Sequence, residues 1–192
     1  MNNTHAVPVA ITSWPLRRVL AAIAGAVFVA LSAQIAVPVP GTPVPITFQL
    51  PAVLIVGGLL GSGLGAASMA VYLLAGMAGL PVFAPGGLLG IARLLGPTGG
   101  YLLAFPVAAA VVGWLSRPTV PLSYRPIGVA LGVVLGFLAI HLGGVAQLAI
   151  ITGDVTTAFV WGSLPFLAGD LMKLLLAGLV VWRFGPNTHA RL

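Results

Sequence analysis

Residues 164–184 read LPFLAGDLMKLLLAGLVVWRF, an apolar stretch of membrane-spanning length with two charged side chains, Asp170 and Lys173, in its interior. Asp170 is one of two acids in the chain, and Lys173 is its one lysine. A charge at the centre of a bilayer costs about 2.5–3.5 kcal/mol on insertion scales. Because the two residues are three positions apart, they lie on one face of a helix. The stretch therefore predicts a membrane helix whose charged face points into the protein rather than toward lipid.

The composition of the whole chain agrees with that prediction. Apolar residues make up 59% of the 192 residues, charged residues make up 5%, and the mean hydropathy is +1.15. Soluble domains carry about 25% charged residues, so this is an integral membrane protein surrounded by membrane lipids. The net charge of +6 comes from scattered basic residues, which is typical of topology signals and not of nucleic-acid binding. The chain has no cysteine, which excludes disulfides and thiolate metal sites.

The apolar segments predict an all-α bundle of six transmembrane helices in a single transmembrane domain, residues 1–192. The expected spans cover residues 16–37, 50–61, 64–80, 98–115, 127–151 and 164–184. Residues 50–80 decide the count, because this region is long for one crossing and short for two. Six spans place six arginines on the cytoplasmic side: Arg17, Arg18, Arg117, Arg125, Arg183 and Arg191. The positive-inside rule therefore favours six spans over five, with cytoplasmic N- and C-termini and a tight turn near Gly61–Gly65.

The first outer loop is rich in proline, with Pro38, Pro40, Pro43 and Pro45 within eight residues. Proline fixes its own φ angle and biases the preceding residue toward extended backbone, so this loop should be stiff. Such a loop suits either a cap over a pocket or a rigid connector at the lipid headgroups, and composition favours neither.

Asp170 and Lys173 are the leading candidates for a ligand site, with a structural ion pair that fixes helix packing as the alternative. An ionised aspartate offers only hydrogen-bond acceptors, while a lysine offers three donors. Together they suit a ligand that carries both N–H groups and a carbonyl or carboxylate.

Residues 96–101, GPTGGY, resemble a phosphate-binding loop only superficially, because the lysine and hydroxyl residue of a Walker motif are absent. They are interpreted as a helix start, with Thr98 as the cap and Gly99 allowing close backbone approach. The free N–H groups at a helix start can bind a carbonyl or carboxylate. Arg93, in the same outer loop, adds a positive charge for either an anionic ligand or a lipid headgroup.

Three small residues, Ala22, Ala26 and Ala30, recur every four positions in the first span. Small residues at this spacing let helices approach closely. The stripe predicts either ordinary packing inside the chain or a lipid-facing surface that docks on another membrane protein.

Two polar residues in the fifth span, His141 and Gln147, are expected to hydrogen-bond neighbouring helices rather than contact a ligand. One intramembrane histidine with one aspartate is too little for a metal site, so none is predicted. Asp154 lies in an outer loop, where we expect it to be solvated.

Four motifs, in order along the chain, carry a resemblance to a known family. They are SAQI (32–35) with VPITFQ (44–49), YLLAG (72–76) with GLPVFA (79–84), GPTGGYL (96–102), and PFLAGDLMK (165–173). With these motifs the chain resembles the BioY family, the biotin-specific substrate-binding (S) components of energy-coupling factor transporters. Ala168 stands where the family often has proline, while the acid and the lysine of the last motif are both present.

The resemblance implies a six-helix S-component in the cytoplasmic membrane of a prokaryote. It implies a non-enzymatic subunit without a cofactor that captures biotin with high affinity from the outer side. The implied partners are a transmembrane coupling protein and ATPase subunits, which would drive delivery inward. The alanine stripe would then be the docking face for the coupling protein.

The resemblance also implies a binding site, with Asp170 accepting from the ureido N–H groups of biotin and Lys173 donating to the ureido carbonyl. Aromatic side chains would enclose the rings, and the outer-loop residues would meet the carboxylate. The remaining candidate contacts are Phe48, Gln49, Phe83, Arg93, Thr98, Gly99 and Tyr101.

Two alternatives stay open from the sequence. An S-component for a different small vitamin would share every fold-level feature, and only the pocket residues favour biotin. A membrane-embedded enzyme could use Asp170 and Lys173 as acid and base, but such enzymes usually need more polar residues or a metal.

Overall fold

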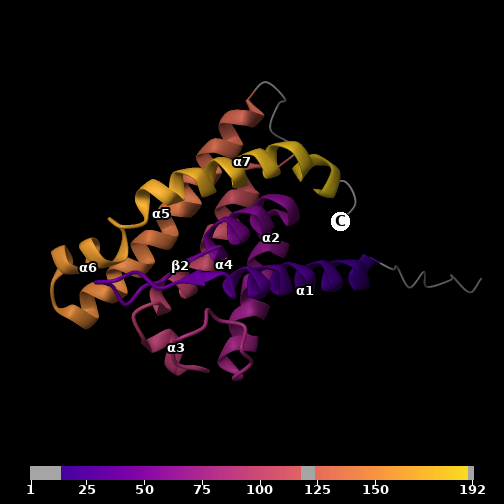
Figure 1. Ribbon diagram of the computed structural model, residues 1–192. Coiled ribbons are helices and arrows are strands. Elements are labelled where there is room, and N and C mark those ends of the chain that lie inside the picture. Colours follow the sequence, from indigo (N-terminus) through magenta and orange to yellow (C-terminus); the bar gives the residue numbers. More distant parts are fainter. Residues whose placement is uncertain (1–13, 118–123, 190–192) are drawn as a thin grey trace, which may run out of the picture.

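A computed structural model describes residues 14–117 and 124–189, and it shows a helical bundle with one short hairpin at one end (Figure 1). The helices are α1 (Trp14–Ala33), α2 (Gln49–Met77), α3 (Ala92–Leu95), α4 (Gly99–Leu115), α5 (Arg125–Thr152), α6 (Val155–Gly162) and α7 (Leu167–His189). The strands are β1 (Ala36–Val37) and β2 (Ile46–Thr47), which pair antiparallel with Ala36 opposite Thr47. Arg191, one of the arginines used to predict topology, lies outside the described residues.

Several of these helices have the length and hydropathy of membrane spans. Three described segments are each long and apolar enough to cross a membrane: residues 16–33 of α1, all of α2 and all of α5. Helices α6 and α7 are long and apolar enough to cross a membrane only when taken together, and they are bent by 57° at the short break between them. The 17 residues of α4 are apolar but shorter than a full crossing. The described chain is therefore an apolar, predominantly helical bundle, as the sequence predicts.

The long second helix is interrupted within the predicted turn region. Gly61 has φ +82° and ψ 172°, a backbone conformation that only glycine adopts readily. A methyl group added at Gly65 would lie 2.8 Å from the Cα atom of Gly57, although residues eight apart in a straight helix are about 12 Å apart. The chain therefore folds back at Gly61, and the two parts of α2 touch through glycines.

Glycines also set the close packing of α2, α4 and α5. A side chain at Gly57 would collide with the backbone of Ala109 in α4, and one at Gly100 would collide with the carbonyl of Gly143 in α5. Without side chains at these positions the helix backbones approach closely, as in many membrane bundles.

The alanine stripe of α1 faces the interior of the bundle. Ala22 and Ala26 are 7% and 6% exposed, and Ala30 is partly buried against the same core. Beside them, a methyl group at Gly25 would lie 2.6 Å from the Oγ atom of Ser68 in α2. The prediction of a lipid-facing docking stripe is therefore wrong for this structure, because the small residues are used to pack α1 against α2.

Side-chain hydrogen bonds tie the connecting segments to the helices. Thr42, in the hairpin loop, donates through Oγ1 to the carbonyl of Trp161 in α6 at 2.7 Å. Gln147 of α5 donates through Nε2 to the carbonyls of Leu94 and Gly96, at 2.8 and 2.7 Å. Gln147 thus fixes the turn between α3 and α4, as expected for a lone polar residue in a span.

Asp154 begins α6 as its N-cap and is exposed, as predicted for a loop residue. Its side chain accepts hydrogen bonds from the backbone N–H groups of Thr156 and Thr157. The pKa of the Asp154 carboxyl is held below its usual value, first by a hydrogen bond with the Thr157 side chain and then by these backbone hydrogen bonds. The cap supplies a partner to N–H groups that have none within the helix.

Candidate ligand-binding site

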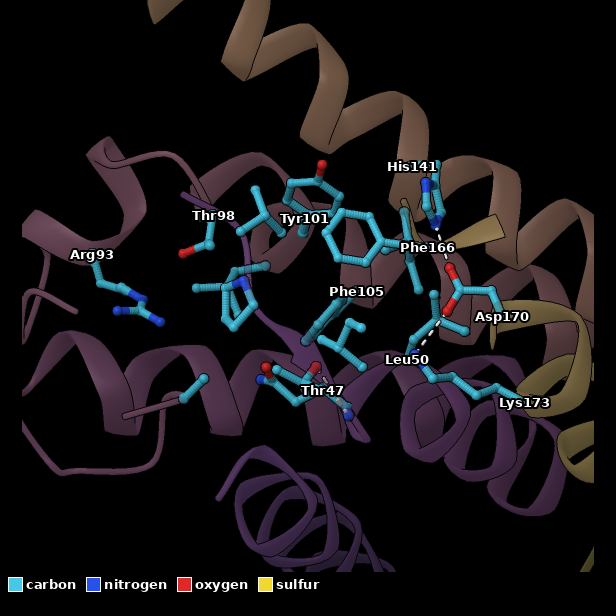
Figure 2. Close-up of a pocket in the computed structure, with 17 residues that line it drawn as sticks. Thr47, Leu50, Arg93, Thr98, Tyr101, Phe105, His141, Phe166, Asp170 and Lys173 are labelled. Carbon is cyan, nitrogen blue, oxygen red and sulfur yellow. Dashed lines mark hydrogen bonds and ion pairs between the residues drawn. The ribbon is translucent and has the colours of Figure 1, made fainter. Parts of the chain in front are cut away.

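An elongated pocket opens inside the bundle between α2, α4, α5 and α7, with β2 and α3 closing its loop side (Figure 2). Its cavity volume is about 70 Å³. Figure 2 shows the side chains of Asp170, His141 and Lys173 at one end and those of Arg93 and Thr98 at the other. The pocket therefore has two chemically different ends.

Asp170 is the centre of the first end. It is 2% exposed, as the charge pattern of residues 164–184 predicts for an inward-facing side chain. It lies in the first turn of α7, because this helix begins at Leu167. Lys173 Nζ donates to Asp170 Oδ1 at 2.7 Å, and His141 Nε2 lies 3.0 Å from Asp170 Oδ2. His141 Nδ1 in turn lies 2.8 Å from the Oγ atom of Ser163. A buried charge without partners would be costly, and these contacts compensate it.

Arg93 defines the opposite end of the pocket. It is 7% exposed, and no described residue forms a hydrogen bond with its Nε atom. Its guanidinium lies against Gly87, where any side chain would collide with it. The pocket lining contains no acid at this end, so Arg93 is positioned to meet an anionic group.

The middle of the pocket is formed by apolar and aromatic side chains, including Leu50, Phe105 and Phe166. Tyr101 joins this wall through its ring, because its hydroxyl donates to the carbonyl of Gly162 at 2.6 Å. The wall therefore suits an apolar part of a ligand between two polar ends.

A second hollow of about 310 Å³ adjoins the pocket and shares Pro45, Arg93 and Thr98 with it. Its other lining residues come from the loop between β1 and β2 and from the loops on either side of α3. The Arg93 end of the pocket therefore faces the connecting loops, while the Asp170 end lies within the helices.

The structure brings six of the sequence-predicted residues into the pocket lining. They are Gln49, Arg93, Thr98, Tyr101, Asp170 and Lys173. Thr98 also precedes α4 as predicted, but its side chain forms no capping hydrogen bond. Figure 2 shows its hydroxyl directed toward the Arg93 end of the pocket.

Phe48, Phe83 and Gly99 are not brought into the lining. Phe48, between β2 and α2, is 45% exposed. Phe83 is buried, but its ring packs over Gly76 and lies edge-on to that of Tyr72 at 5.4 Å. The backbone of Gly99 is packed against the carbonyl of Leu94. These three residues are therefore not part of the site that we propose below.

His141 is the main site residue that the sequence interpretation missed. It bonds neighbouring segments as expected, but it does so within the pocket and to Asp170. A signal was present, because an intramembrane histidine opposite an intramembrane acid is a candidate partner for it. Thr47, Phe105 and Phe166 also line the pocket, and no spacing rule points to them.

The arrangement can bind a small molecule with a hydrogen-bonding head, an apolar middle and an anionic tail. Asp170 supplies acceptors and Lys173 donors at one end, the aromatic wall encloses the middle, and Arg93 supplies a cation at the other. Fold and pocket together define a helical membrane protein with an internal binding site for a small amphipathic solute.

The chain belongs to the BioY family, whose sequence model matches residues 3–189. A protein from Pyrococcus horikoshii named probable biotin transporter BioY is 41% identical over 166 residues, which are 85% of this chain and 94% of that protein. The biotin transporter BioY of Thermotoga maritima is 38% identical over 148 residues, or 76% of this chain and 83% of that protein.

The fold is also found in a solved structure. The crystal structure of the S-component for biotin from an ECF-type ABC transporter superposes with a TM-score of 0.75 and 25% sequence identity. The match covers 90% of this chain and 92% of that one. The architecture of the described helices is thus that of an S-component.

Proposed function

We propose that this chain is the membrane subunit that binds biotin in an energy-coupled uptake system. The observation that carries the proposal is the pairing of Asp170 and Lys173 at one end of a pocket whose other end holds Arg93. The names of the relatives and of the solved structure support the same ligand. They also argue against the alternative of a membrane-embedded enzyme.

The two ends of the pocket correspond to the two ends of biotin. The ureido group offers two N–H donors, which Asp170 can accept, and one carbonyl, to which Lys173 can donate. The fused rings and aliphatic tail lie along Tyr101 and Phe105, and the carboxylate reaches Arg93. The alternative of an S-component for a different vitamin is less suitable, because a vitamin without adjacent N–H donors would leave Asp170 without ligand partners.

The proposal includes six spans with both termini in the cytoplasm of a prokaryotic cell. The break at Gly61 divides α2 into two spans, and α7 is the last. Arg125 Nη2 donates to the carbonyl of Trp182 at 2.6 Å, which supports a shared cytoplasmic end for the start of α5 and the end of α7. The hairpin and α3 then lie on the outer side, where biotin enters and high-affinity binding begins.

Delivery of biotin inward is assigned to partners. The proposed partners are an energy-coupling transmembrane protein and ATPase subunits, because the matched solved structure is an S-component from an ECF-type ABC transporter. Since the alanine stripe of α1 is buried, the docking surface for the coupling protein is not assigned to it.

Biotin binding by the purified chain in detergent, measured by calorimetry, tests the proposal. Asp170→Asn should weaken binding at least about tenfold, the loss expected for one charge-assisted hydrogen bond. The matched control is Asp154→Asn, which changes the only other acid in the chain at an exposed position. Equal affinity in both variants, or no binding of biotin by the unchanged protein, would refute the proposed site or function respectively.

A further inference from the structure

A chain of hydrogen-bonded side chains runs from Asp170 through His141, which lines the pocket, to Ser163, which is not in the pocket lining. His141 of α5 lies between Asp170 of α7 and Ser163 of the α6–α7 connection, with contacts of 3.0 and 2.8 Å. All three residues are buried, with exposed fractions of 7%, 2% and 3% in that order. Nothing in the binding scheme above uses His141 or Ser163, yet His141 contacts the acid on which that scheme depends, and Ser163 contacts His141.

The chemistry of Asp170 fixes the direction of its hydrogen bond with His141. Lys173 donates to Oδ1 of Asp170 at 2.7 Å, which stabilises the ionised carboxylate. A carboxylate only accepts, so the ring nitrogen that faces it, Nε2 of His141, must carry the hydrogen. In the neutral imidazole Nδ1 is then a lone pair, which accepts the hydroxyl hydrogen of Ser163.

The ring of His141 is held in this orientation by aromatic neighbours. The ring of Phe137, one turn earlier in α5, lies 4.3 Å from it between centroids, and the ring of Tyr101 in α4 lies edge-on at 6.2 Å. The hydroxyl of Tyr101 donates to the carbonyl of Gly162 and does not compete for the imidazole. A ring flip would therefore have to displace packed side chains as well as two hydrogen bonds.

From this geometry we propose that His141 is a positioning residue for Asp170, and that the hydroxyl of Ser163 holds the imidazole in this orientation. The Nε2–H group occupies one lone pair of Oδ2 and fixes the plane of the carboxylate, so that the remaining lone pairs are presented at a fixed angle. In the opposite tautomer a nitrogen lone pair would face the carboxylate and turn it away from the ligand. The proposal rests on the proposed function. It deepens that function by naming the residues that orient Asp170, the acid proposed to bind biotin.

Two amide substitutions separate positioning from packing. The side-chain nitrogen of His141→Gln can reach the place of Nε2, while that of the shorter His141→Asn reaches only the place of Nδ1. We expect His141→Asn to raise the Kd for biotin about tenfold or more and His141→Gln to raise it much less, about threefold. Equal losses in the two variants, each shown by thermal unfolding to be folded, would overturn the positioning role.

A spectroscopic measurement tests the tautomer without any ligand. Nitrogen-15 chemical shifts of histidine rings distinguish the protonated from the bare nitrogen, and the variants His5→Gln and His189→Gln remove the other two histidine signals. Because Asp170 requires the hydrogen on Nε2, we expect the Nε2–H form in the unchanged protein and in Ser163→Ala alike. Loss of the hydrogen bond to Nδ1 should shift the signal of that nitrogen in Ser163→Ala and raise the Kd at least about threefold. The matched control is Ser32→Ala, whose hydroxyl donates to the carbonyl of Phe28 at an exposed site in α1.

The outcomes are distinguishable from failure of the proposed function. If the unchanged protein does not bind biotin, the proposed function fails while the ring signals still report the tautomer. If it binds biotin but shows the Nδ1–H form or an imidazolium, or if Ser163→Ala leaves both signals and affinity unchanged, this inference is overturned alone.

Discussion

Substitutions of Asp170 and Lys173 should be strongly coupled in their effect on stability but should not compensate each other in their effect on biotin affinity. A double-mutant cycle can measure both effects. The variants are Asp170→Asn, Lys173→Met and the combination of the two. Each single change leaves one fully or partly buried side chain without its oppositely charged partner, whereas the combination leaves none. Stability without ligand should therefore be partly restored in the double variant, while affinity for biotin should not.

The magnitudes follow from burial and contacts. Removing one partner of a buried ion pair costs about 3–5 kcal/mol. Lys173→Met belongs at the lower end, about 3 kcal/mol, because His141 still donates to Asp170. For a chain of this length, about 2–4 °C of Tm corresponds to 1 kcal/mol, which gives a fall of about 6–12 °C. Asp170→Asn should cost less, because the Lys173 side chain is 13% exposed and can reach solvent.

The double variant keeps an acceptor for His141 and has no buried charge at this end of the pocket. We expect it to be at least about 1.5 kcal/mol more stable than Lys173→Met, or about 3–6 °C higher in Tm. Affinity follows a different rule, because both ligand contacts are lost. Loss of two charge-assisted hydrogen bonds should weaken biotin binding more than about 100-fold in the double variant.

Thermal unfolding in detergent without biotin and calorimetric titration with biotin supply the two sets of values. The coupling energy is the difference between the double change and the sum of the single changes. A coupling near zero would show that the two side chains do not compensate each other in the folded protein. Recovery of biotin affinity in the double variant would show that the pair is structural and that biotin binds through other groups.

Three further predictions concern other parts of the chain. Arg93→Ala should weaken biotin binding about tenfold or more but leave binding of biotin methyl ester nearly unchanged, because the ester lacks the carboxylate charge. The control Arg117→Ala, at an exposed position, should affect binding of neither ligand. Gly57→Ala should destabilise the fold by about 1–3 kcal/mol, because its methyl group meets the backbone of α4, whereas Gly63→Ala has open space and should be tolerated in thermal unfolding. The folded-state pKa of Asp154 is lowered, so its contribution to stability is present above the ordinary aspartate pKa of about 3.9 and is lost as pH falls through the folded-state value. The difference in Tm between the unchanged protein and Asp154→Ala should therefore shrink in acid, and a difference that persists there would contradict the capping role.

The sequence was sufficient to predict the charged end of the site, because charge inside an apolar span has few physical solutions. Asp170 and Lys173 had to face inward, and their spacing made a mutual contact possible. The break in α2 was predicted for a similar reason, since length and a run of glycines left little else. Both inferences used strong local constraints that tertiary packing does not reverse.

The direction in which a residue faces was harder to predict when its side chain is small or apolar. Ala26 suits a contact with another protein as well as it suits packing against α2, and only the neighbouring helix decides between them. Phe83 has the chemistry of a pocket wall, but it packs over Gly76. The sequence shows that Gly76 has no side chain, but it does not show which residue fills that space. His141 was missed because its partner lies 29 positions away on another helix.

The structural ion pair and the proposed ligand site, which are alternatives from the sequence, involve the same atoms. A carboxylate offers about four acceptor positions, and Lys173 and His141 occupy one on each oxygen of Asp170. About two positions remain, which equals the number of N–H groups on a ureido ring. Lys173 similarly uses one of its three donors on Asp170, which leaves donors for a carbonyl. The contacts that make the buried charge of Asp170 tolerable therefore also orient it, and under the proposed function biotin can add to them without breaking them.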